Sequence, residues 1–122
     1  MRTCISYAGN ATAYTHGIPI HLQRLLIQQY CADRGLEVRF EQLEIEVMPH
    51  LPILLHLVDV TRPEVIVLFS IYALPADAAL RAPILDAALA HRVTLCFANE
   101  AEELAGPGDR DRLERILRFS AR

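Results

Sequence analysis

The run VIVLFS at residues 65–70 is the stretch of sequence that decides the fold. Its first five residues are apolar without interruption and mostly β-branched, which is typical of a strand covered on both faces in a parallel sheet. Residues 93–98 are predicted to form another strand, and residues 3–8 are a short β-branched and apolar run that Gly9 ends, which also predicts a strand. Residues 36–45 instead alternate apolar and charged side chains, which predicts a half-exposed strand at an edge of the sheet.

Helices are predicted between these strands, because the intervening segments carry apolar residues at helical spacing. Pro19 opens the first helix, where its missing N–H group is not needed, and Gly35 ends it. Residues 51–60 fit a short buried helix that Pro63 ends. The alternation of strands and helices predicts a single α/β domain. Its mainly parallel sheet has four or slightly more strands, with helices on both faces.

The last third of the chain adds two helices to this prediction. Residues 77–91 form an Ala- and Leu-rich helix in which Pro83 causes a kink or marks a restart. Residues 1–104 then make up the α/β domain, and residues 105–122 make up a hinge and an amphipathic helix capped by Asp109. We expect this final helix to pack on the domain or on a partner subunit.

Composition restricts the class of protein. The chain has 122 residues, of which 52% are hydrophobic and 22% charged, so it forms one folded domain. A net charge of −3 argues against a nucleic-acid partner. All 12 basic residues are Arg, which excludes Schiff-base catalysis by a lysine and a P-loop lysine. With no targeting segment and no apolar run of bilayer length, the sequence predicts a cytoplasmic protein without a membrane partner.

The spacing of cysteine and histidine gives no metal-binding motif. Cys4, Cys31 and Cys96 are far apart in apolar contexts, so they are interpreted as buried hydrophobic residues and not as disulfides, zinc ligands or nucleophiles. No two histidines have the spacing of two ligands on one helical face. The loop after the first strand also lacks the glycine pattern of a dinucleotide or P-loop site. The sequence predicts neither a metal nor an organic cofactor.

Polar residues follow the predicted strands at their carboxyl ends, where ligands of parallel sheets bind. Ser70 and Tyr72 follow the third strand, and Asn99 and Glu100 follow the fourth. Asn10 follows the first strand, at a turn where an anion site is one possibility and an ordinary β-to-α turn the other. Ser70 is interpreted either as a ligand-binding residue or as a cap of the chain reversal.

Acid–base candidates come from the same edge of the sheet. His16 is the best histidine for this role, and a solvated loop histidine is the alternative interpretation. Glu44 and Glu46 share a face if the second strand continues that far, and one of them then reaches the crevice as a general base. The alternative, which we favour for Glu41, is a solvated edge that prevents unwanted strand pairing.

Parts of the chain resemble the N-terminal catalytic domain of serine recombinases of the resolvase/invertase type. The strand start ISYA at residues 5–8, the helix segment at residues 23–35 and the strand at residues 65–69 carry the resemblance, which covers residues 3–98. It implies a resolvase-like, flavodoxin-like fold. Recombinases use a serine nucleophile in a Tyr-Ala-Arg-x-Ser context, but residues 7–11 read YAGNA. Because the arginine and the serine are absent, the chain is not expected to be an active recombinase.

A second resemblance is to the sporadic carbohydrate cluster proteins, which occur in bacterial gene clusters for surface polysaccharides and unusual sugars. The shared phrases include GIP at residues 17–19 with Gln23, FSIYALP at residues 69–75, and FA at residues 97–98 with Glu100. The FSIYALP phrase is the most specific of them. This resemblance, over residues 5–104, implies a role in carbohydrate biosynthesis but no particular reaction.

Two hypotheses follow. In the first, the protein binds or acts on a sugar, sugar phosphate or nucleotide sugar as an isomerase, epimerase or lyase without an organic cofactor. Substrate binding is then assigned to Asn10, Gln23, Ser70, Tyr72 and Asn99. Proton exchange is assigned to Glu46, Glu100 or His16. In the second hypothesis, the protein is a homodimeric, non-catalytic partner subunit or a sugar-sensing module on a resolvase-like scaffold.

Overall fold

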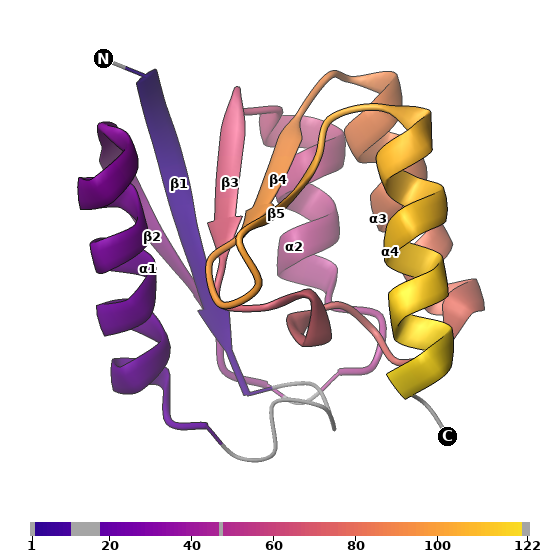
Figure 1. Cartoon of the computed structure of the whole chain (residues 1–122). Helices are drawn as coiled ribbons and strands as arrows, with labels where there is room; N and C mark the ends of the chain where they lie inside the picture. The colour runs from indigo at the N-terminus through magenta and orange to yellow at the C-terminus, as the bar shows by residue number, and fades with distance from the viewer. Residues whose placement is uncertain (1, 11–17, 47, 121–122) are drawn as a thin grey trace.

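The structure is a computed structural model that describes residues 2–10, 18–46 and 48–120 (Figure 1). Its centre is a five-stranded sheet in the order β2-β1-β3-β4-β5. Strand β1 pairs in parallel with β2 and β3, and β3 pairs in parallel with β4. Only β5 runs antiparallel to its neighbour, β4. The expected α/β fold with a mainly parallel sheet is confirmed.

The strands and helices alternate along the chain as predicted up to β4, which β5 follows without a helix between them. The strands are β1 (Arg2–Gly9), β2 (Leu36–Glu44), β3 (Val65–Leu68), β4 (Thr94–Phe97) and β5 (Glu102–Leu104). The α-helices are α1 (Ile20–Arg34), α2 (Pro52–His56), α3 (Ala78–Ala90) and α4 (Pro107–Ser120). A π-helical turn η2 (Leu57–Thr61) continues α2, and a 3₁₀ turn η3 (Ile71–Ala73) follows β3. Within the described ranges, no helix is long and apolar enough to cross a membrane.

Strand β2 lies at an edge of the sheet, as its alternating sequence predicts. Strand β5 at the opposite edge was not predicted, because its sequence, Glu-Glu-Leu, has neither the length nor the β-branched residues of a recognisable strand. It pairs with β4 through main-chain hydrogen bonds, with Phe97 opposite Glu102 and Leu95 opposite Leu104.

Helices cover both faces of the sheet. Figure 1 shows α1 on one face and α2, α3 and α4 on the other. Successive residues of β1 therefore enter different cores: Cys4 lies in the core under α1, while Ile5 lies in the larger core on the opposite face. Leu113 and Leu117 of α4 are buried in that larger core as well. Of the two alternatives for the final helix, the structure thus shows packing on the domain.

Two features of the helices differ from the signals in the sequence: Pro83 does not interrupt α3, and α4 begins before its predicted cap. Gly35 caps the C-terminus of α1 in a left-handed conformation with φ 66°, as expected for a glycine in that place. Helix α3 runs through Pro83 as one helix without a restart, and the Asp77 side chain caps its first turn. Helix α4 begins at Pro107, two residues before the predicted cap Asp109.

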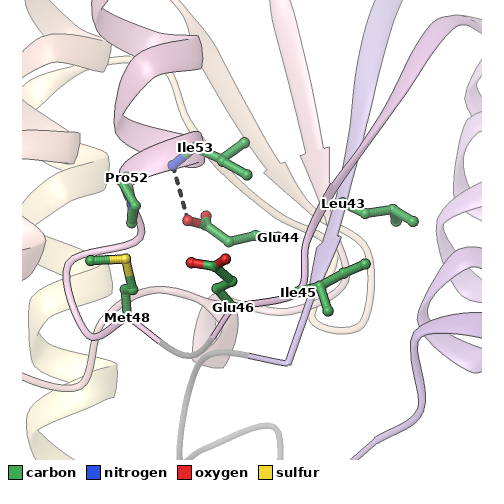
Figure 2. A pocket seen from close by; sticks show the side chains of 7 residues that line it. All are labelled: Leu43, Glu44, Ile45, Glu46, Met48, Pro52 and Ile53. Carbon is green, nitrogen blue, oxygen red and sulfur yellow. Dashed lines mark hydrogen bonds between the residues drawn. The ribbon is translucent and has the colours of Figure 1, made fainter.

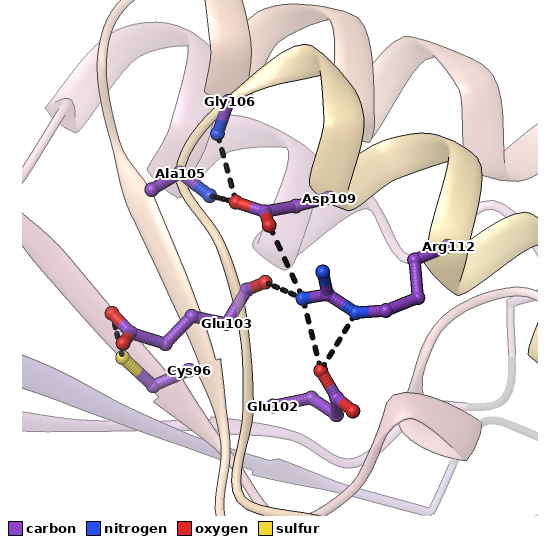
Figure 3. Close-up of polar contacts among 7 residues, drawn as sticks. All are labelled: Cys96, Glu102, Glu103, Ala105, Gly106, Asp109 and Arg112. Carbon is purple, nitrogen blue, oxygen red and sulfur yellow. Dashed lines mark hydrogen bonds and ion pairs between the residues drawn. The ribbon is translucent and has the colours of Figure 1, made fainter.

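Asp109 still binds main-chain N–H groups at the start of α4, but it lies within the first turn of the helix and not before it. Its carboxylate accepts hydrogen bonds from the N–H groups of Ala105 at 2.9 Å and Gly106 at 3.1 Å. These bonds, the one from Ala105 above all, lower the pKa of Asp109. The same carboxylate pairs with Arg112, which also binds Glu102 and so connects α4 to β5 (Figure 3).

A second ion pair fixes α4 to α3. Arg81 is only 4% exposed and donates two hydrogen bonds to the Glu114 carboxylate, at 2.6 and 2.9 Å. Its guanidinium also donates to the main-chain oxygens of Pro75 and Ala76. The hydrogen bonds from Arg81 lower the pKa of Glu114. The C-terminal helix is therefore bound to the domain by apolar packing and by a nearly buried bidentate pair.

Candidate functional site at the carboxyl ends of the strands

The four parallel strands end at one edge of the sheet, where the sequence places its candidate site residues (Figure 1). Two polar groups are found there. The first surrounds Glu44 at the end of β2, and the second surrounds Glu100 beyond the end of β4. The first borders a pocket.

Glu44 is a buried carboxylate with only 1% of its surface exposed. The Tyr7 phenol donates to Glu44 Oε1 at 2.6 Å. The main-chain N–H groups of Ile53 and Leu54, at the start of α2, donate at 2.9 and 3.2 Å. Burial and, to a smaller extent, the bond to Glu44 raise the pKa of Tyr7, so the phenol keeps its proton and acts as a donor.

This carboxylate takes the place of a helix cap. Leu51, the residue before α2, is fully buried in a left-handed conformation with φ 49°, and it makes no side-chain cap. Pro52 at the first helical position has no N–H group. Glu44 reaches across from β2 to accept from the next two N–H groups and places a negative charge at the positive end of the helix. Glu44 is thus neither a solvated edge residue nor a free base.

A close approach of two strands accompanies this arrangement. A Cβ atom at Gly9 would lie 2.8 Å from the main-chain oxygen of Glu44, so only glycine fits there without movement. The next residue, Asn10, donates its main-chain N–H to the same oxygen at 3.3 Å and its side-chain amide to the Ile45 oxygen at 3.2 Å. The ends of β1 and β2 are therefore held together by main-chain and side-chain bonds.

A pocket of about 380 Å³ opens beside Glu44. It is lined by Leu43, Glu44, Ile45, Glu46, Met48, Pro52 and Ile53 (Figure 2). Strand β2 ends at Glu44, so Glu46 lies on the following loop and not on the strand face shared with Glu44. Its exposed carboxylate nevertheless lines the same pocket. The pocket thus combines two carboxylates with apolar walls, and none of the described residues that line it is an arginine or a histidine.

Glu100 is the centre of the second polar group. Its carboxylate accepts from the Ser70 hydroxyl at 2.5 Å, from the Ile71 N–H at 2.9 Å and from the Asn99 side-chain amide at 3.1 Å. The Ser70 hydroxyl also accepts from the Tyr72 N–H at 3.1 Å and caps η3. The structure therefore brings together four predicted site residues: Ser70, Tyr72, Asn99 and Glu100. Their contacts hold the turn after β3 against the loop after β4.

Gln23 on α1 also uses its side chain to hold two parts of the protein together. It is fully buried, and its side-chain amide pairs with both the N–H and the C=O of Gly9 while also donating to the Ile18 oxygen. It thereby holds the first turn of α1 against the end of β1. His16 lies outside the described residues. Among the described residues, no group of three or more His, Cys, Asp and Glu side chains is arranged to hold a metal ion.

Most polar residues at this edge were predicted from the sequence, but the hydrogen bond from Tyr7 to Glu44 was not. A tyrosine within an apolar strand gives little indication that its phenol meets a carboxylate on another strand. The available signal was Glu44, the acidic residue nearest the end of β2, followed by a helix whose start has no capping side chain.

Comparisons with solved structures support the fold. The chain is similar to a resolvase family site-specific recombinase from Streptococcus pneumoniae, with a TM-score of 0.66 and 11% identity over 99% of this chain and 89% of the other. It is also similar to the N-terminal catalytic domain of TP901-1 integrase, with a TM-score of 0.65 and 13% identity over 98% and 94% of the two chains. No family model and no curated protein matches the sequence. The structural similarity establishes a resolvase-like fold.

Proposed function

We propose that this protein binds a small uncharged sugar in the pocket beside Glu44 and Glu46. The observation that carries the proposal is the exposed Glu46 carboxylate, which makes no side-chain hydrogen bond or ion pair with the described residues and lines a pocket with mostly apolar walls at the carboxyl ends of the strands. A carboxylate accepts hydrogen bonds from two neighbouring hydroxyl groups, and the apolar walls suit the C–H faces of a sugar ring. We also propose a role in carbohydrate biosynthesis, which is what the resemblance to carbohydrate cluster proteins implies, and a cytoplasmic location.

Charge favours an uncharged sugar over a sugar phosphate or a nucleotide sugar. Among the described residues, two carboxylates line the pocket and no basic side chain does. The nearest arginine in the sequence, Arg39, is in the middle of β2 and lines a different pocket. A phosphate dianion would be repelled by the carboxylates and would find no partner for its charge there.

Glu46 is also the residue best placed for proton exchange. Glu100 is occupied by Ser70, Ile71 and Asn99, so its carboxylate serves the two loops that it joins. Glu46 is exposed to the pocket and free to approach a bound molecule. We extend the proposal to cofactor-independent isomerisation or epimerisation, in which Glu46 takes a proton from a carbon next to the sugar carbonyl and returns it.

Binding is tested by thermal unfolding and titration calorimetry with neutral monosaccharides, amino sugars and sugar phosphates. A neutral sugar at 100 times its dissociation constant should stabilise the protein by about 2.7 kcal/mol. Glu46→Gln should weaken binding at least tenfold. Glu37→Gln removes the same charge from an exposed position of β2 that does not line the pocket, so it should bind like the wild type. Absence of binding by all neutral sugars, or tighter binding of sugar phosphates, would refute the proposal.

A second candidate is a non-catalytic homodimeric subunit. Asn10, Gln23, Ser70, Asn99 and Glu100 all use polar side-chain atoms within the protein. Helix α1 also exposes Leu22, Leu25 and Leu26, with Leu25 58% exposed. Neighbouring exposed leucines are typical of a protein interface.

The dimer is tested by light scattering at several protein concentrations. The second candidate predicts a dimer that Leu25→Glu converts to a monomer, whereas Ala79→Glu leaves it intact, because Ala79 is an exposed residue of α3, on the opposite face of the sheet. A monomeric wild-type protein at high concentration would contradict it. Truncation before α4 is unsuitable as a test, because Leu113 and Leu117 belong to the core.

A further inference from the structure

Two cysteines that are far apart in the sequence meet inside the protein. The sulfur atoms of Cys4 on β1 and Cys31 on α1 lie 3.8 Å apart and form a thiol–thiol hydrogen bond. Both residues are buried, at 3% and 2% exposure, in the smaller core between α1 and the sheet. A disulfide needs the two sulfurs to approach to about 2.05 Å. The two sulfurs therefore have to approach from 3.8 Å to bonding distance.

We propose that Cys4 and Cys31 form a reversible disulfide when the folded protein meets a hydroperoxide. The inference is independent of the proposed sugar site, which lies at the carboxyl ends of the strands. Cys4 is near the amino end of β1, and Cys31 is in the last turn of α1, so the pair lies away from the carboxyl ends of the strands. The last turn of a helix opens locally at low cost, which admits a molecule as small as hydrogen peroxide.

The position of each sulfur in the fold assigns it a role. Either sulfur can donate the hydrogen bond between the thiols, so the bond itself does not distinguish them. Cys31 is in the last turn of α1, which opens more readily than the sheet does, so its sulfur meets the peroxide first and attacks as the thiolate. Cys4, on β1, is the thiol that resolves the intermediate.

The reaction balances with hydrogen peroxide as the oxidant. The Cys31 sulfur attacks one peroxide oxygen; an S–O bond forms, the O–O bond breaks, and the released hydroxide leaves as water with the proton that Cys31 gave up. The Cys4 sulfur then attacks the Cys31 sulfur; the S–S bond forms, the S–O bond breaks, and the second water leaves with the proton of Cys4. Two thiols lose two electrons in total, which the peroxide accepts.

Cys96 is in the same core but in a different environment. Burial raises the pKa of its thiol to about 11, and its sulfur lies 3.9 Å from a carboxylate oxygen of Glu103 on β5 (Figure 3). A negative charge on this sulfur is disfavoured next to a carboxylate. The disulfide should therefore join Cys4 to Cys31 and leave Cys96 as a thiol.

Peptide mapping of the wild-type protein tests the pairing without any substitution. Because the only basic residues are arginines, trypsin places the cysteines on separate peptides, residues 3–24, 25–34 and 93–110. The folded protein is treated with hydrogen peroxide, alkylated in denaturant and digested. We expect peptides 3–24 and 25–34 to be joined, an intact mass lower by about 2 Da before alkylation, alkylation only at Cys96, and full reversal by dithiothreitol.

Variants provide matched controls. Cys96→Ala should form the same disulfide at an unchanged rate, whereas Cys4→Ala should lose it and accumulate oxidised Cys31 or intermolecular dimers. Circular dichroism before and after treatment checks that the protein stays folded. The proposal is refuted if both thiols remain alkylatable after treatment, if Cys96 pairs as often as Cys4 does, or if the disulfide forms only in denaturant.

Discussion

Tyr7 and Glu44, which are 37 residues apart in the chain, are joined by a 2.6 Å hydrogen bond from the buried phenol to the buried carboxylate. Because Glu44 also accepts from the first N–H groups of α2, a single side chain connects β1, β2 and α2 next to the pocket. The geometry of the proposed sugar site therefore depends on the Glu44 carboxylate, whether or not Glu44 itself touches the ligand.

Replacing Glu44 tests this connection. In Glu44→Gln the side chain keeps its size but loses the charge that the phenol and two N–H groups bind, so the free energy of unfolding should fall by about 1.5–3 kcal/mol. Urea unfolding measures the difference. Glu41→Gln is a suitable control, because Glu41 on the same strand forms an exposed pair with Arg24 and its loss should have little effect. Equal effects of the two substitutions would contradict the assigned role of Glu44.

Alkaline pH should destabilise the protein through Tyr7. Its pKa is raised in the folded state by burial and by Glu44, so the unfolded chain releases the proton first. The stabilisation is fully present below the unfolded-state pKa of about 10 and decreases as the pH rises above it. Tyr7→Phe should be less stable at pH 7 and should lose less stability between pH 9 and 11. Tyr30, Cys4 and Cys96, whose pKa values are also raised in the folded state, contribute to the remaining dependence.

Gly9→Ala should disturb the junction of β1 and β2. The added Cβ would meet the Glu44 oxygen at 2.8 Å, a main-chain atom that can move only with the strand. We expect a loss of about 1–3 kcal/mol in the free energy of unfolding, as for other overpacked sites. Gly108→Ala is the matched control, because no atom lies within 4 Å of the new Cβ there. A Gly9→Ala variant as stable as that control would show that the strand ends are not closely constrained.

Acid should weaken the attachment of α4. The pKa of Glu114 is lowered in the folded state, chiefly by its hydrogen bonds to Arg81. The contribution of this pair is therefore present above the unfolded-state pKa of about 4.3 and is lost as the pH falls through the lower folded-state value.

Glu114→Gln should remove about 2 kcal/mol at pH 7, a value between those of exposed and buried pairs. The variant should also depend less on pH between 5 and 3 than the wild-type protein does. Hydrogen exchange of the α4 amides measures both effects. If the wild-type protein and Glu114→Gln lose the same stability between pH 5 and 3, other carboxylates cause the sensitivity to acid.

The sequence by itself determined the class of fold. The uninterrupted apolar run at residues 65–69, the alternating strand at residues 36–44 and the helices between them establish a mainly parallel sheet covered on both faces. The end of the first helix at Gly35 was also predicted correctly. These features depend on the residues of one segment and its neighbours, so a pattern in the chain is enough to recognise them.

Only the tertiary structure decided how distant polar and sulfur atoms are paired. Strand β5 exists because β4 offers it an edge, Glu44 caps a helix from a neighbouring strand, and Cys4 meets Cys31 across the interface of β1 and α1. Likewise, the Ser70 hydroxyl was a candidate ligand-binding group in the sequence but donates to Glu100 in the structure. Such contacts depend on register and packing to within about an ångström, because a hydrogen bond weakens quickly with distance and angle. The spacing of residues along the chain does not contain that information.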